Sequence, residues 1–298
     1  MTSNRLDPIT FEVVKNALDS LVDEMAITVM RTAYSGVVKE ALDYSTAFCG
    51  ADGQVIAQGL TIMLHLGSFP VAVQSVLTKY DGRINPGDVF VLNDPYTSGG
   101  IHLPDVFIIK PVFAEDALQG FVGAVAHQAD IGGLVPGSNS TESTEIYQEG
   151  LRIPTSKLYA EGVPSEAVFD LIATNVRLPI QVRGDMRSQL AACEIGERAL
   201  LALIDRYGAA ELNRHCEALL DYSELRARQE ISALPDGKYE FEDYIDADNI
   251  KEGPLKIVVS LEIAGDEITV DLEGSSPQVP AGINSPLPFT HAAIYGAI

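Results

Sequence analysis

Two short motifs in this chain pair a histidine with an aspartate three residues further on. His102 and Asp105 lie in H-L-P-D, and His127 and Asp130 lie in H-Q-A-D; each motif borders a strand-like apolar run and a cluster of glycines. The proline in the first motif forbids an ordinary helix, so its two side chains must converge through a turn entering a strand over Val106–Ile109. Imidazoles and carboxylates together suit Zn²⁺, Mn²⁺ or Fe²⁺. The spacing indicates a divalent metal site at a sheet rim, where an open position could activate water or polarise a carbonyl oxygen.

The pattern H-x-x-D is much less specific than H-E-x-x-H, so a second interpretation stays open. In that interpretation His102 and His127 act as acid and base without a metal. Asp130 is followed by Ile-Gly-Gly, a turn that could bring its carboxylate or backbone N–H groups toward a ligand. His102, His127 and Asp130 are therefore the candidate catalytic residues.

Two carboxylates, Glu40 and Asp43, stand three residues apart in a stretch otherwise poor in charge. They precede a predicted β-hairpin over residues 45–58, turned by Ala-Asp-Gly. Carboxylates in such places are usually caps or surface groups. Because Glu40 and Asp43 stand where the chain enters a strand beside the expected site, either of them could also be a ligand.

Three residues are candidates for contact with substrate. Asp94 lies in N-D-P-Y, just upstream of the first motif, and His65 stands next to a Gly-Ser turn in an apolar context. A lone histidine there is more often a core residue than a ligand. Arg152, in G-L-R-I-P at the end of a long polar loop, could pair with a substrate carboxylate or with Glu149.

The composition narrows the class of protein. The 298 residues are 46% hydrophobic with a formal net charge of -22, enough for a sizeable core and unsuited to nucleic acid or an anionic membrane surface. Three cysteines without C-x-x-C spacing, and no apolar signal or membrane segment, favour a reduced, cytoplasmic protein. Walker-type, G-x-G-x-x-G and G-x-S-x-G motifs are absent, so the sequence gives no sign of ATP binding by this chain.

The hydrophobic periodicity predicts an α+β fold with mixed or antiparallel sheets. We expect a long N-terminal helix over about residues 8–34, inside an α+β region over 1–160 that carries the metal site. A helical segment follows over 161–234, then antiparallel strands over 235–298. The last residues resemble a helix without a cap or polar tail, so we expect another chain, or a longer polypeptide, to complete the fold.

Five motifs also carry a family resemblance. The opening D-P-I-T-F-E-V-V-K-N-A-L, then H-L-G-S, N-D-P-Y-T-S-G-G-I-H-L-P-D-V, A-H-Q-A-D-I-G-G and S-T-E-I-Y-Q-E-G-L-R-I-P resemble those of the hydantoinase B / 5-oxoprolinase family. The resemblance runs from residue 7 to the end of the chain, although full B components are considerably longer. Related proteins include the α-type subunits of acetone and acetophenone carboxylases.

The resemblance implies a hetero-oligomer with an A-type partner that carries the ATP and Mg²⁺ site. That partner phosphorylates the carbonyl or enol oxygen of a cyclic amide or a ketone-derived substrate, and the B component completes the reaction. In the carboxylase branch a glutamate, a histidine, an aspartate and a second histidine hold a metal. By motif, these correspond here to Glu40, with Asp43 as its rival, and to His102, Asp105 and His127.

The same resemblance makes Asp130 either a partner that orients His127 or an extra ligand. It implies a subunit of an ATP-dependent cyclic amide hydrolase of the hydantoinase or 5-oxoprolinase type, with His65 and Arg152 lining the pocket. The opening motif and the S-T-E-I-Y-Q-E-G-L-R-I-P loop favour this hydrolase branch. The alternatives are an α-type subunit of a ketone carboxylase and a non-catalytic assembly subunit.

Overall fold

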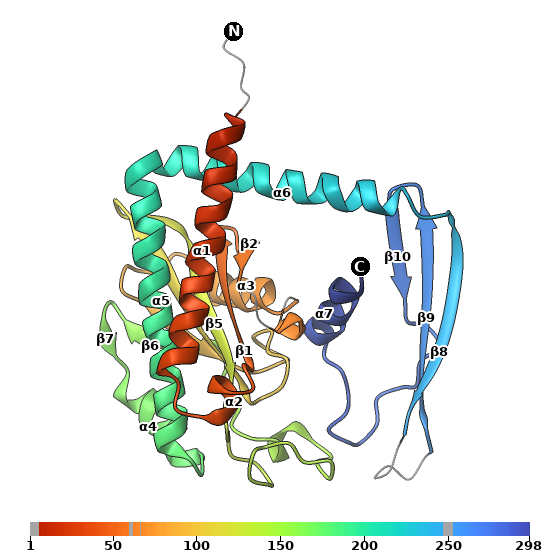
Figure 1. Cartoon of the computed structure of the whole chain (residues 1–298). Helices are drawn as coiled ribbons and strands as arrows, with labels where there is room; N and C mark the ends of the chain where they lie inside the picture. The colour runs from red at the N-terminus through yellow and green to blue at the C-terminus, as the bar shows by residue number, and fades with distance from the viewer. Residues whose placement is uncertain (1–5, 60–61, 66, 247–252) are drawn as a thin grey trace.

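The computed structural model describes residues 6–59, 62–65, 67–246 and 253–298. Its main body is a seven-stranded antiparallel sheet with the strand order β2-β1-β5-β4-β3-β6-β7 (Figure 1). The strands of this sheet are β1 (Tyr44–Gly50), β2 (Val55–Gln58), β3 (Val89–Leu92), β4 (Asp105–Ala114), β5 (Ala117–His127), β6 (Ser156–Ala160) and β7 (Val163–Pro164).

The central strands are apolar on both faces, because successive side chains of a strand point to opposite sides. Ile108 and Val122 belong to one buried cluster, whereas Phe107 and Phe121 belong to a second cluster on the other face. Near-continuous apolar runs in β4 and β5 are therefore explained by helices covering both faces of the sheet.

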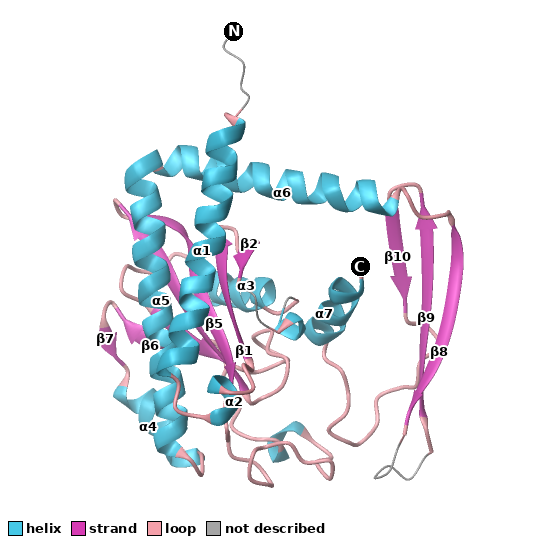
Figure 2. Ribbon diagram, viewed as in Figure 1, coloured by secondary structure: helices cyan, strands magenta, loops and turns pink. Residues whose placement is uncertain are grey.

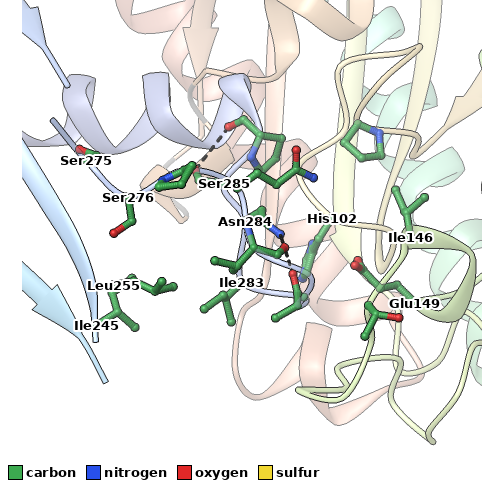
Figure 3. Close-up of a pocket in the computed structure, with 18 of the residues that line it drawn as sticks. His102, Ile146, Glu149, Ile245, Leu255, Ser275, Ser276, Ile283, Asn284 and Ser285 are labelled. Atoms are coloured by element: carbon green, nitrogen blue, oxygen red, sulfur yellow. Dashed lines mark hydrogen bonds between the residues drawn. The ribbon is translucent and has the colours of Figure 1, made fainter. Parts of the chain in front are cut away.

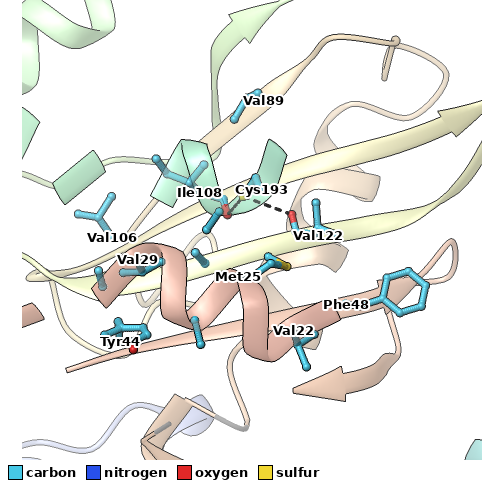
Figure 4. Packing of buried hydrophobic residues seen from close by; sticks show 14 of the residues in the cluster. Val22, Met25, Val29, Tyr44, Phe48, Val89, Val106, Ile108, Val122 and Cys193 are labelled. Carbon is cyan, nitrogen blue, oxygen red and sulfur yellow. Dashed lines mark hydrogen bonds between the residues drawn. The ribbon is translucent and has the colours of Figure 1, made fainter. Parts of the chain in front are cut away.

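Helices α1 (Pro8–Thr32) and α5 (Pro179–Tyr207) pack side by side over the first cluster, and α3 (Phe69–Lys79) covers the second. Figure 4 shows Met25 and Val29 of α1 and Cys193 of α5 against Ile108 and Val122 of the sheet. Helix α4 (Glu166–Asn175) packs beside α5. None of the helices among the described residues is both long and apolar enough to span a membrane.

Helix α1 begins as its sequence dictates. The Asp7 carboxylate accepts a hydrogen bond from the Thr10 N–H (2.9 Å), and Pro8 takes the first helical position. One stripe of the helix is buried, from Val14 to Val29. The helix ends at Thr32, two residues before the predicted end.

The C-terminal part of the chain lies apart from the main sheet. Helix α6 (Ala209–Ile231) leads from the main body to a three-stranded antiparallel sheet of order β10-β9-β8 (Figure 2). Its strands are β8 (Gly237–Ile245), β9 (Leu255–Ala264) and β10 (Glu267–Asp271), and the final helix α7 (Leu287–Ala297) packs back against the 3₁₀ helix η1 (Met63–His65).

The predicted α+β class, with antiparallel sheets and a central helical segment, is confirmed. The helical segment is integrated with the sheet, because residues of the predicted regions 1–160 and 161–234 share one core. A domain division at these residues stays a prediction.

Candidate metal centre

The two histidine–aspartate motifs meet at the rim of the sheet where β4 begins and β5 ends. The antiparallel register places Asp105, the first residue of β4, opposite His127, the last residue of β5. The H-L-P-D turn is closed by a hydrogen bond from the Asp105 N–H to the His102 carbonyl (3.1 Å). The local chain path thus brings three potential ligands to one point.

Asp105 is the centre of this group. Its Oδ2 lies 2.8 Å from Nδ1 of His102, and its Oδ1 lies 3.4 Å from Nδ1 of His127. The two imidazole rings have centroids 4.9 Å apart. One donor atom from each of the three residues lies within 4.8 Å of the others.

Asp43 and His65 extend the group on its other side. The His127 N–H donates to the Asp43 carbonyl (3.0 Å), which places the Asp43 carboxylate 3.7 Å from Nδ1 of His127. Nε2 of His65 lies 3.5 Å from Oδ2 of Asp105. Asp43, His65 and Asp105 also have donor atoms within 4.8 Å of one another.

Burial and the neighbouring imidazoles control the charges here. Burial alone would raise the pKa of Asp105, which is only 3% exposed, but contacts with His102, His127 and His65 hold its pKa well below the usual range. Burial disfavours the charged form of His102, yet the Asp105 carboxylate outweighs this effect and raises the pKa of His102. The centre is thus built around an ionised carboxylate.

Several buried donor atoms fit a cation. Oδ1 of Asp105 and Nδ1 of His102 make no hydrogen bond with described residues, although Nδ1 lies 2.8 Å from Oδ2 of Asp105. Ser45 directs its hydroxyl hydrogen to the Ile62 carbonyl (3.1 Å), so it accepts from Nδ1–H of His65 (2.8 Å). The opposite ring nitrogen, Nε2, faces Oδ2 of Asp105, so the hydrogen bond to Ser45 sets how His65 meets this carboxylate.

The structure separates the two carboxylates that the sequence left as rivals. Glu40 is the exposed C-cap of the short helix α2 (Gly36–Lys39) and belongs to neither group of potential ligands among the described residues. Asp43 directly precedes β1, beyond a turn in which Leu42 adopts a left-handed conformation (φ 58°). That turn carries Asp43 to the rim of the sheet.

Asp130 lies in a different set of interactions. Its carboxylate accepts from the N–H groups of Gly132 (3.1 Å) and Gly137 (3.2 Å), and from the N–H (2.7 Å) and Nη1 (2.9 Å) of Arg177. Burial would raise its pKa, but these donors keep the pKa of Asp130 below its ordinary value. Its hydrogen bonds and ion pairs with described residues include none to His127. The catalytic role of Asp130 stays a prediction that no contact with His127 supports.

Asp94 and Arg152 pair with each other at the wall of a cavity of about 520 Å³. The Arg152 guanidinium packs against the rings of Tyr147 and Tyr96, with centroid distances of 5.2 and 5.7 Å. The sequence offered Glu149 as the partner of Arg152 within this chain, but Arg152 pairs instead with Asp94, which was not foreseen as its partner. Their role in substrate binding stays a prediction.

A cavity of about 500 Å³ opens beside His102 (Figure 3). Its walls come from the 144–149 loop, the ends of β8 and β9, and the connector that follows β10. Glu149 lies on this wall, and sequence reasoning gave it no role beyond pairing with Arg152. Its proximity to His102 arises from tertiary packing, which no local motif signals.

Fold and site together define a class of protein. The family model described as Hydantoinase B/oxoprolinase matches residues 7–298, and the chain belongs to this family. It is 39% identical to the beta chain of the caprolactamase of Pseudomonas jessenii over 282 residues, which cover 95% of this chain and 48% of that protein. It is 36% identical over 293 residues to the B component of a putative D-/L-hydantoinase of Pseudomonas sp. (strain NS671), covering 95% and 49%.

Solved structures agree with this assignment. The crystal structure of ATP-dependent caprolactamase from Pseudomonas jessenii matches with a TM-score of 0.93 and 38% identity, covering 98% of this chain and 50% of that one. A nucleotide-free acetone carboxylase shares the fold, with a TM-score of 0.91 at 20% identity, covering 97% and 40%. The chain spans about half the length of the curated relatives named here.

Proposed function

We propose that this chain is the metal-holding part of a B-type component of an ATP-dependent enzyme that hydrolyses cyclic amides. The observation that carries the proposal is the cluster of three imidazoles and two carboxylates at the sheet rim, beside a cavity of about 500 Å³. The family relationship supports it, because two relatives above 35% identity are named as components of a caprolactamase and a putative hydantoinase.

In this proposal Asp43, His102, Asp105 and His127 hold the ion, which is zinc, manganese or iron. A divalent ion at this position supplies Lewis-acid activation of water or of the substrate oxygen. His65 positions the Asp105 carboxylate, and the bond between His65 and Ser45 fixes the orientation of its ring.

The substrate reaches this site already activated. A hydantoinase A-type partner binds ATP and Mg²⁺ and phosphorylates the carbonyl oxygen of the ring, and this chain then directs water to the activated carbon. The cavity beside His102 receives the activated ring, since it has both apolar walls, from Ile245 and Leu255, and polar groups such as Glu149. The two components work together in a cytoplasmic hetero-oligomer.

Carboxylation of a ketone-derived substrate is the alternative reaction for the same site. The acetone carboxylase likeness, at 20% identity, shows the fold alone. The more similar relatives act in the hydrolase branch according to their names. Hydrolysis is therefore the reaction that we propose.

Ring opening of a lactam by this protein, assembled with its ATP-binding partner, tests this function. His102→Ala and His127→Ala should abolish product formation while leaving the far-ultraviolet circular dichroism spectrum unchanged; His291→Ala, in α7, is the matched control. Full activity in the His102→Ala variant would overturn the metal role. A product that appears only with bicarbonate would select the carboxylase reaction, and partner binding without turnover in the wild type would select a non-catalytic assembly role.

A further inference from the structure

One carboxyl group on the wall of the cavity beside His102 has no partner in the part of the chain that the structure describes. Glu149 follows the 3₁₀ helix η2 (Ile146–Gln148), and its N–H donates to the Ile146 carbonyl (3.0 Å). Its side-chain carboxyl makes no hydrogen bond or ion pair with any described residue. A half-buried carboxyl left free at a cavity is available to a ligand.

The connector that follows β10 covers this carboxyl. A Cβ atom built at Gly282 would lie 3.8 Å from Oε1 of Glu149, so the backbone of the connector approaches it closely. Figure 3 shows Glu149 and His102 on the wall of the same cavity. Burial raises the pKa of Glu149, and the charge of His102 opposes that shift.

The other charged side chains on this wall are Glu145 and Lys256. Lys256 is occupied by an ion pair with Glu242 on the neighbouring strand β8. Glu145 is exposed at the start of the loop. Glu149 is thus the carboxyl on this wall that combines partial burial, a side chain without a described partner and a place beside the expected metal ligand.

We propose that Glu149 is a catalytic acid–base residue that delivers a proton to the ring nitrogen of the substrate when its C–N bond breaks. This inference rests on the proposed function, because it assumes a cyclic amide phosphorylated on its carbonyl oxygen. It adds a residue outside the set of metal ligands and assigns it one step.

The chemistry requires such a group. Phosphorylation of the carbonyl oxygen leaves a C=N double bond, and water adds to its carbon while one water proton goes to the nitrogen. The adduct then carries a hydroxyl, a phosphate ester and an N–H group on one carbon. When the C–N bond breaks, its electron pair leaves with the nitrogen; Glu149 takes the hydroxyl proton and gives a proton to the nitrogen. The products are an amine and an acyl phosphate, which a second water converts to carboxylate and phosphate.

The same adduct has an unproductive outcome. If the C–O bond to phosphate breaks first, phosphate leaves and the intact ring is re-formed, so that ATP is consumed without ring opening. A proton supplied to the nitrogen makes it the better leaving group. Glu149 therefore controls how many rings are opened per ATP hydrolysed.

The assembled enzyme with Glu149→Gln tests this role. The variant should keep its metal content and its ADP formation with substrate, while ring-opened product per ADP falls by about 10²–10⁴-fold, the usual contribution of a general acid. Glu149→Asp keeps an acid group and should retain most of the ring-opened product per ADP formed. Glu142→Gln changes an exposed residue just before the 144–149 loop; it is the matched control and should match the wild type.

Three results would overturn the inference. One is a Glu149→Gln variant that opens as many rings per ADP as the wild type. Another is a loss of metal from that variant, since the residue would then act on the metal centre. If the wild-type assembly consumes no ATP and opens no ring, the proposed function itself fails, and the inference fails with it.

Discussion

Asp130→Asn tests whether the aspartate of the H-Q-A-D motif stabilises the fold rather than serving the metal centre. Oδ1 accepts from the Gly137 N–H and Nη1 of Arg177, and Oδ2 accepts from the N–H groups of Gly132 and Arg177. An asparagine side chain offers one acceptor oxygen, so two of these four donors lose their acceptor whichever way the amide turns.

The less costly orientation keeps the amide oxygen at the Oδ2 position. The half-buried Gly137 N–H then loses its acceptor, which costs about 1–3 kcal/mol, with the lower end applying to a donor that water can reach. Because the Arg177 side chain is 40% exposed, its lost ion pair adds at most about 1 kcal/mol. We expect the free energy of unfolding to fall by about 1–4 kcal/mol. For a chain of this size, Tm falls by roughly 2–4 °C for each kcal/mol lost.

The effect depends on pH with a defined sign. The pKa of Asp130 is lowered in the folded protein, so its contribution is present above the ordinary value of 3.8 and is lost as the pH falls through the folded pKa. Thermal unfolding followed by circular dichroism at pH 7 should show the full difference from wild type, which narrows below pH 3.8. Wild-type stability with lost metal or activity would refute this structural role.

Two further predictions concern the ligands. Glu40→Gln should leave metal content unchanged, whereas Asp43→Asn should weaken metal binding by at least about 10-fold, as measured by chelator competition; the reverse ranking would restore Glu40 as the ligand. His65→Ala should lower metal affinity by about 10–100-fold without removing the site, because this residue positions Asp105. Unchanged affinity in the His65→Ala variant would contradict that positioning.

The sequence predicted the part of the site that local chain geometry determines. The proline in H-L-P-D required a turn into a strand, and β4 begins at Asp105. Alternation and apolar runs predicted the strands, and Asp7 with Pro8 predicted the start of α1. In each case the signal lies within a few residues of the feature.

Features that depend on residues far apart in the chain were not predicted from the sequence. Arg177, the partner of Asp130, is 47 residues further along the chain. The choice between Glu40 and Asp43 depends on the left-handed turn at Leu42, a conformation that a leucine seldom adopts. No periodicity in the sequence indicates the pairing of Arg177 with Asp130 or the turn at Leu42.

The packing of α5 shows the same limit. The sequence predicted a helical segment here without saying what it packs against, and α5 lies against the sheet and α1. A Cβ atom at Gly196 would lie 2.4 Å from Sδ of Met25, so this glycine permits the close approach of the two helices. The need for a glycine at this position can be recognised only when the positions of α1 and α5 are both known.

The proposed site has Asp43, His102, Asp105 and His127 around one divalent ion. Elemental analysis of the purified, undialysed protein measures whether that ion is present, with His291→Ala as the matched control. We expect about one zinc, manganese or iron per chain in the wild type and the control, lost in His102→Ala and in His127→Ala. Wild-type protein without bound metal, or equal metal content in all four proteins, would contradict the proposed site.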